Sequence, residues 1–150
     1  MPILHSLSDN LEIIYHRDYR IIIGRFLRSL SEDENRQCYL DLLAAAHAHH
    51  DCRYWLLDIR RRHRSGPVVM QWLQHDFYLQ MQRELGTPVR LVYFMAPGLH
   101  EEFQTDGTAP TPSTYKPTDS FYINQCITEG ESVRWLLDEQ KAEAQQQMAQ

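Results

Sequence analysis

The sequence predicts an α/β fold with one mixed, mainly parallel sheet of five strands, an N-terminal antiparallel hairpin and three or four flanking helices. Two segments, 54–59 and 89–95, are apolar at consecutive positions, as strands buried on both faces of a sheet are. Segments with helical spacing and helix start signals alternate with them. A chain of 150 residues with 43% hydrophobic residues has the size and apolar content of one domain. We expect its core between residues 11 and 138, followed by a polar tail over 139–150.

The first element expected is a β-hairpin. Over residues 11–16 apolar side chains recur at alternate positions, and a second strand over 19–27 follows the short break at Arg17 and Asp18. A connection this short joins strands that run antiparallel. The hairpin therefore supplies an antiparallel edge before the rest of the sheet.

A helix is expected over residues 31–50. Ser31 and Glu34 have the spacing of a capping box, in which each side chain accepts a hydrogen bond from the other residue's backbone N–H. Apolar residues then recur at helical spacing from Tyr39 to Ala46. One face of this helix is therefore predicted to pack on the core.

The strand over 54–59 is predicted to lie in the middle of the sheet. A second helix should begin near Pro67, because proline is favoured at the first helical position, and should end at Gly86, a common helix stop. The apolar stripe between these two residues would cover the sheet. The next strand, over 89–95, ends before Pro97.

Residues 104–118 are predicted to form a long surface loop, because they contain several prolines and almost no aliphatic residues. Loops of this length are often lids or binding loops. A last strand follows over 120–127, and Thr128 and Glu131 have the spacing of a second capping box. The final helix is expected to bury little beyond residue 138.

Composition narrows the classes of function. The net charge of −5 at pH 7 argues against nucleic-acid binding, which needs a concentrated positive surface. No stretch approaches the roughly 20 apolar residues of a membrane helix, and the first residues do not resemble a signal peptide, so we expect no membrane span and a cytoplasmic protein. The sequence contains no glycine-rich nucleotide loop, zinc-protease motif or nucleophile elbow. It therefore predicts no enzyme and no cofactor.

Histidine and cysteine are the remaining reactive residue types. Residues 47–52 collect histidine, aspartate and cysteine, and His47 and His50 can share a helical face. No second cluster completes a ligand set, so we predict no metal site and a helix-capping role for this segment. The 3 cysteines are widely spaced, which favours buried, reduced thiols over disulfides or nucleophiles.

The order of elements resembles the STAS superfamily, the fold of anti-sigma-factor antagonists, and in particular its small bacterial SpoIIAA-like branch, which is STAS/SEC14-like. The resemblance covers roughly residues 11 to 138 and rests on the element order, the strand ending at Asp58, the strand and turn over 89–97, and the final helix. In phosphorylatable members, a serine at the start of the helix after the central strand receives phosphate from a partner kinase. Ser65 is the counterpart here, with Arg64 in place of the usual acidic residue. The resemblance implies a non-catalytic regulatory or ligand-binding module.

The strongest candidate site is the loop after the central strand. Open α/β sheets bind ligands at the carboxyl ends of their strands, and a helix start adds oriented N–H groups. Arginine side chains there can hold a phosphate or a carboxylate through paired donors. The candidate anion- or partner-binding residues are Asp58, Arg60, Arg61, Arg62, Arg64, Ser65 and Gly66. The alternatives are a solvated basic loop, in which Asp58 neutralises one arginine, and a nucleic-acid contact.

Together these patterns predict a non-enzymatic regulatory or interaction module that binds a partner protein or a small anionic ligand at this loop. The alternative is a carrier or sensor of a small apolar or lipid-like ligand, held among aromatic side chains beneath residues 104–118. This alternative expects an internal cavity. The sequence also leaves open a homodimer, formed through a sheet edge or an apolar helix face.

Overall fold

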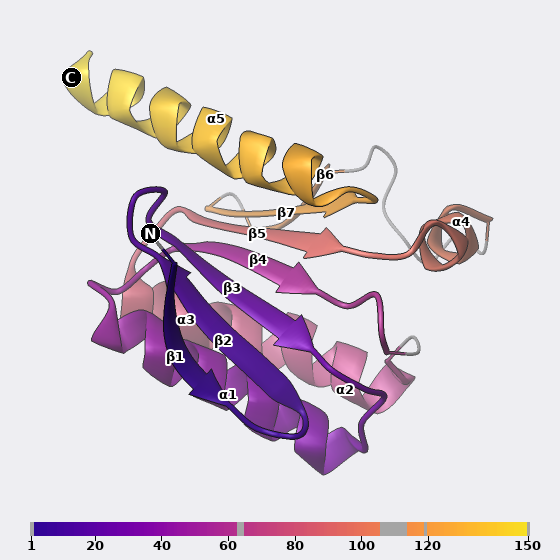
Figure 1. The fold of residues 1–150 in the computed structure, drawn as a ribbon. Coiled ribbons are helices and arrows are strands. Elements are labelled where there is room, and N and C mark those ends of the chain that lie inside the picture. Colours follow the sequence, from indigo (N-terminus) through magenta and orange to yellow (C-terminus); the bar gives the residue numbers. More distant parts are fainter. Residues whose placement is uncertain (1, 63–64, 106–113, 119, 150) are drawn as a thin grey trace.

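The computed structural model describes residues 2–62, 65–105, 114–118 and 120–149. Helices lie on both sides of one sheet (Figure 1). The elements in chain order are β1 (Pro2–Leu7), β2 (Leu11–His16), β3 (Ile21–Phe26), α1 (Glu32–Ala48), β4 (Tyr54–Asp58), α2 (Pro67–Trp72), the π-helical turn η1 (Leu73–Phe77), α3 (Tyr78–Leu85), β5 (Val89–Phe94), α4 (Pro97–Thr105), β6 (Thr114–Thr118), β7 (Phe121–Cys126) and α5 (Glu129–Met148).

The sheet has seven strands in the order β1-β2-β3-β4-β5-β7-β6. Strands β3, β4, β5 and β7 are parallel and form its centre. Strands β1 and β2 continue the sheet antiparallel on one side, and β6 does so on the other. The predicted α/β class and the antiparallel N-terminal hairpin are therefore confirmed.

All five expected strands form, and β1 and β6 are additions at opposite edges. Strand β1 escapes prediction because nearly all its side chains are exposed, so its sequence lacks a buried alternation. The expected loop over 104–118 is interrupted by the end of α4 and by β6, while residues 106–113 lie outside the described residues. Pro117 fits in β6 because this edge strand pairs with one neighbour only.

One face of the sheet is covered by α1 and by the continuous helical run from α2 through α3 (Figure 1). The capping box at the start of α1 is confirmed. Ser31 Oγ accepts from the Glu34 N–H at 3.2 Å, and the Glu34 carboxylate accepts from the Ser31 N–H at 2.9 Å. Helix α1 approaches β3 so closely that a Cβ on Gly24 would lie 2.7 Å from a Leu42 methyl carbon. The core on this side is built from large buried side chains such as Trp55.

The opposite face is covered by α5, which lies over β4, β5 and β7 (Figure 1). Thr128 Oγ1 accepts from the Glu131 N–H at 3.1 Å, so the helix begins where predicted. The reciprocal bond of a complete capping box, present at α1, is not formed here among the residues described. None of the described helices is long and apolar enough to cross a membrane.

The segment 139–150, expected as a polar tail, continues α5 as far as Met148. Glu143 in this segment is only 8% exposed. Its carboxylate lies 2.8 Å from Arg53 Nη1 and accepts a hydrogen bond from the Tyr54 hydroxyl. The end of α5 therefore docks on the sheet through buried polar contacts, which a search for apolar periodicity does not detect.

Candidate functional site

The predicted binding loop follows β4 at the carboxyl end of the parallel strands. Strands β3 and β5 flank β4, so the ends of both border the loop. The loop begins with a backbone contact to β5, because the Ile59 N–H donates to the Phe94 carbonyl oxygen at 2.9 Å. Side chains of the loop are thus held over the position that ligands favour in open α/β sheets.

Asp58 is buried, and arginines engage both of its carboxylate oxygens. Oδ1 accepts from the backbone N–H of Arg60 at 3.2 Å and from Arg60 Nε at 3.0 Å, while Oδ2 accepts from Arg60 Nη2 at 2.8 Å. Arg25 Nη1 also donates to Oδ2, at 3.0 Å. Burial acts to raise the pKa of Asp58, but the hydrogen bonds from Arg60 and Arg25 outweigh it, and the pKa lies below its usual value. Arg60 is therefore already paired with a carboxylate.

Arg25 on β3 connects Asp58 to two further carboxylates. Its Nη2 lies 2.5 Å from Glu129 Oε1, and its Nε lies 3.7 Å from Glu12 Oε1. The parallel register places Arg25 directly beside Asp58. The sequence patterns predict no role for Arg25, although it is the one charged residue in an otherwise apolar strand.

Arg62 points toward α1 instead of toward Asp58. Its Nη1 donates to Asn35 Oδ1 at 3.1 Å, and its Nη2 donates to the Tyr39 hydroxyl at 3.2 Å. The centre of its guanidinium lies 4.3 Å from the centre of the Phe26 ring. Among the residues described, no aspartate or glutamate oxygen lies within 4.0 Å of this guanidinium. Because arginine stays protonated in proteins, Arg62 is a positive charge whose hydrogen-bond partners among the described residues are neutral.

A line of tyrosine hydroxyls continues inward from Arg62. The hydroxyl oxygens of Tyr39 and Tyr93 are 3.0 Å apart, and those of Tyr93 and Tyr78 are also 3.0 Å apart. Burial raises the pKa of Tyr93 well above its usual value. Tyr93 therefore stays protonated at neutral pH and supplies no negative charge to balance Arg62.

The other predicted site residues take different positions. Arg61 is exposed in the turn, and Gly66 is the N-cap residue of α2. The Ser65 Oγ is buried and has no hydrogen-bond partner among the residues described. Arg64 lies outside the described residues. The structure thus divides the predicted site into a neutralised pair, Asp58 with Arg60, and Arg62, which has no carboxylate partner in the part of the chain that is described.

The histidine-rich segment at the end of α1 makes pairwise contacts. His47 Nδ1 lies 2.8 Å from Asp51 Oδ1, and His47 Nε2 lies 2.8 Å from Glu84 Oε1 on α3. Hydrogen bonds to Glu84 and Asp51 raise the pKa of His47. His49 Nε2 lies 3.1 Å from His5 Nδ1 on β1. In the described part of the chain, no three His, Cys, Asp or Glu side chains are grouped to hold a metal ion.

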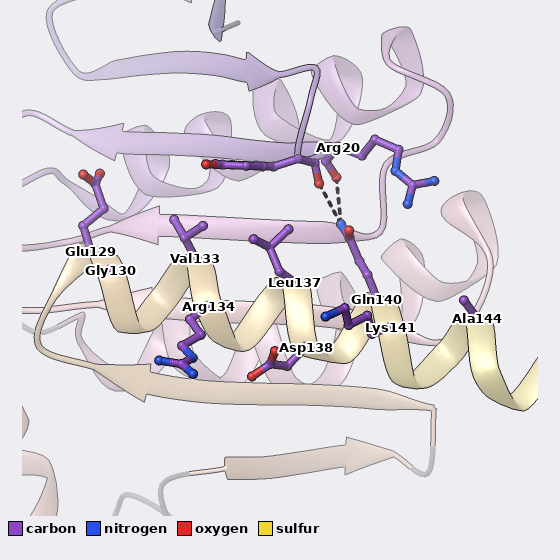
Figure 2. Close-up of a pocket in the computed structure, with 11 residues that line it drawn as sticks. Arg20, Glu129, Gly130, Val133, Arg134, Leu137, Asp138, Gln140, Lys141 and Ala144 are labelled. Carbon is purple, nitrogen blue, oxygen red and sulfur yellow. Dashed lines mark hydrogen bonds between the residues drawn. The ribbon is translucent and has the colours of Figure 1, made fainter.

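A groove of about 740 Å³ lies on the other face of the sheet, between α5 and the turn that joins β2 to β3 (Figure 2). Gln140 crosses it, and its Nε2 donates to the Tyr19 carbonyl oxygen at 2.8 Å. Val133 and Leu137 supply apolar wall, while the other lining residues are mostly polar or charged. Ligand pockets for apolar molecules are usually lined more uniformly by hydrophobic side chains. The sequence predicts an apolar pocket beneath residues 104–118, and none of the described residues of that segment is among those that line this groove.

Comparison of the chain with family models, with curated proteins and with solved structures finds no match in any of the three.

Proposed function

We propose that the protein is a cytoplasmic, non-enzymatic interaction module that binds a carboxylate or phosphate group, carried by a small ligand or a partner protein, at the loop after β4. The observation that carries the proposal is the guanidinium of Arg62, whose partners in the described part of the chain are neutral. Arg60 and Arg25, by contrast, are each bound to a carboxylate. Of these three arginines, Arg62 is the one that contacts no carboxylate among the described residues.

The surroundings of Arg62 favour binding over simple solvation. Asn35 and Tyr39 fix the guanidinium from one side, and the Phe26 ring packs against it. A guanidinium held in place loses less conformational entropy when it binds an anion, and its remaining N–H donors match the oxygens of a carboxylate or a phosphate. Exposed Arg61, the preceding residue, adds positive charge to the same turn.

The cysteines support a module without nucleophilic chemistry. Burial raises the pKa of Cys38 to about 11 and that of Cys52 to about 12. A thiol of this kind holds almost no thiolate at neutral pH, and the thiolate is the reactive form. The element order that resembles STAS modules points to the same class of function.

The test is an NMR titration of the ¹⁵N-labelled protein with inorganic phosphate and, separately, with citrate. We expect saturable shifts of amide signals in the loop after β4 and around Asn35, and their loss in Arg62→Gln. Arg83→Gln is the matched control, because Arg83 is exposed on α3 and lies outside the loop. If neither anion produces shifts that depend on Arg62, the proposal is wrong.

A further inference from the structure

The sheet ends in two edge strands that differ in how they are protected. Each has one neighbour among the described strands, so the outward backbone groups of β1 and β6 pair with no other strand there. Such an edge can add a strand from another chain unless charge, proline or a cover prevents it. Strand β6 carries Lys116 and Pro117. Strand β1 has proline only at its first residue and contains no Lys, Arg, Asp or Glu.

Strand β1 also exposes large apolar side chains. Leu4 is 57% exposed and Leu7 is 62% exposed. In the antiparallel register, Leu4 lies opposite Ile14, and Leu7 lies opposite Glu12, so both leucines lie on the same face of the sheet as these β2 residues. This is the face of the sheet where α5 covers β4, β5 and β7 and leaves β1 outside its cover (Figure 1).

The two ends of β1 carry opposite charge. The turn after β1 contains exposed Asp9, while the start of β1 lies beside His16 and the next turn, in which exposed Arg17 and Arg20 outnumber exposed Asp18. If two copies paired antiparallel along β1, the Asp9 end of each copy would lie beside the Arg17 end of the other. The exposed charges at the ends of the strand therefore favour antiparallel pairing of two identical strands over parallel pairing.

We propose that this protein forms a homodimer about a two-fold axis, in which β1 of one copy pairs antiparallel with β1 of the other and the two sheets become one. The pairing satisfies the outward backbone groups of both strands. It also brings Leu4 and Leu7 of one copy next to those of its partner, which removes apolar surface from water. This inference is independent of the anion site at Arg62, which lies in the loop after β4.

The first test measures the oligomeric state of the full chain by sedimentation equilibrium over a range of concentrations. We expect a reversible dimer, and we expect Leu4→Lys to raise its dissociation constant about tenfold or more, because it places like charges near the two-fold axis. Leu79→Lys is the matched control, since Leu79 is 43% exposed on α3. Circular dichroism and urea unfolding identify any variant that fails to fold.

A second test locates the contact without introducing charge. The natural cysteines are all buried, so an added surface cysteine reacts selectively. We expect Leu4→Cys or Ser6→Cys to form a disulfide-linked dimer under mild oxidation faster than Leu79→Cys. A wild-type protein that stays monomeric at every concentration overturns the proposal, even if β1 then captures a strand from another protein. A dimer that is insensitive to Leu4→Lys and is not cross-linked through β1 overturns it as well.

Discussion

The carboxylate of Asp58 and the guanidinium of Arg60 are joined by two hydrogen bonds, of 3.0 and 2.8 Å, although only Ile59 separates the two residues in the chain. The same carboxylate holds Arg25 from the neighbouring strand. Buried Asp58 therefore binds both the start of the loop, through Arg60, and strand β3, through Arg25. Arg62, further along the loop, binds α1 instead. The contacts of Asp58 with Arg60 stabilise the loop, and the different contacts of Arg62 are the basis of the proposed anion site.

Replacing Asp58 should destabilise the protein more than replacing its partner. We expect Asp58→Asn to lower the free energy of unfolding by about 2–4 kcal/mol, because it removes a buried carboxylate that is the anion of Arg60 and one of the anions of Arg25. Arg60→Gln should cost about 1 kcal/mol or less, because the Arg60 side chain is 47% exposed and Arg25 still balances Asp58. Urea denaturation measures both values, and equal losses would contradict this account.

The contribution of Asp58 should depend on pH in the acid range. Its pKa is lower in the folded protein than its usual value, so ionised Asp58 stabilises the fold. This stabilisation is complete above the unfolded-state pKa of about 3.9 and is lost as the pH falls through the lower folded-state pKa. Stability curves of the wild type and Asp58→Asn should therefore converge in strong acid. A difference that stays constant throughout the acid range would count against the prediction.

His47 should show the opposite dependence. Hydrogen bonds to Glu84 and Asp51 raise its pKa, so the protonated form is stabilised in the fold. Its contribution is complete below the unfolded-state pKa of about 6.5 and disappears as the pH rises through the higher folded-state pKa. We expect His47→Gln to cost under about 1 kcal/mol at pH 5.5 and nothing at alkaline pH, because the side chain is 39% exposed.

An NMR titration of the histidine side chains checks the assignment directly, since the His47 signal should titrate above its ordinary range. His75→Gln on the same protein is a suitable control, because His75 is exposed and, within the described residues, lacks the pair of carboxylates that His47 contacts. If His47 titrates below its ordinary range, the bridge between α1 and α3 does not form in solution.

Two glycine substitutions should have opposite effects. Gly24→Ala should lower the free energy of unfolding by about 1–3 kcal/mol, because the new Cβ would lie 2.7 Å from a carbon of buried Leu42 and 3.1 Å from one of Leu57. Gly130→Ala should raise it by up to about 1 kcal/mol, because this glycine lies in α5 with no atom near the added carbon. Thermal and urea unfolding of both variants measure the contrast, and a neutral Gly24→Ala would refute the close contact of α1 with β3.

The thiols should be unreactive until the protein unfolds. Burial is the main cause of the raised pKa of Cys38, Cys52 and Cys126. At pH 8 we expect negligible reaction of the native protein with a thiol-specific disulfide reagent, and reaction of all three cysteines in urea. Rapid labelling of any one thiol in the native state would contradict this burial and would remove the basis for selective cross-linking through an added cysteine.

The parts of the fold that follow local rules could be predicted from the sequence. The capping box at Ser31 and the consecutive apolar residues of β4 and β5 depend on short-range chemistry, and all three predictions agree with the structure. Strand β1 could not be predicted, because its pairing with β2 leaves most of its side chains exposed. The extension of α5 depends on Glu143 meeting Arg53, a contact between residues distant in the chain.

The same distinction applies to the candidate site. The sequence places Asp58 and its arginines after a central strand, because that position follows from element order alone. The sequence does not show that Arg60 binds Asp58 while Arg62 binds α1. That difference arises because Asn35 and Tyr39 of α1 lie close enough to the loop to accept hydrogen bonds from Arg62. Arg25 enters the site through the register of β3 against β4, which adjacent residues in the chain do not reveal.

The order of the strands has a consequence for synthesis of the protein. Strand β5 pairs with β7, and β4 is covered by α5, whose Glu143 neutralises Arg53 near the end of the chain. A nascent chain that ends at residue 120 therefore holds β5 without one neighbour and Arg53 without its anion. The sheet can therefore close only after the segment up to about Glu143 has left the ribosome, because β5 and Arg53 lack these partners until then.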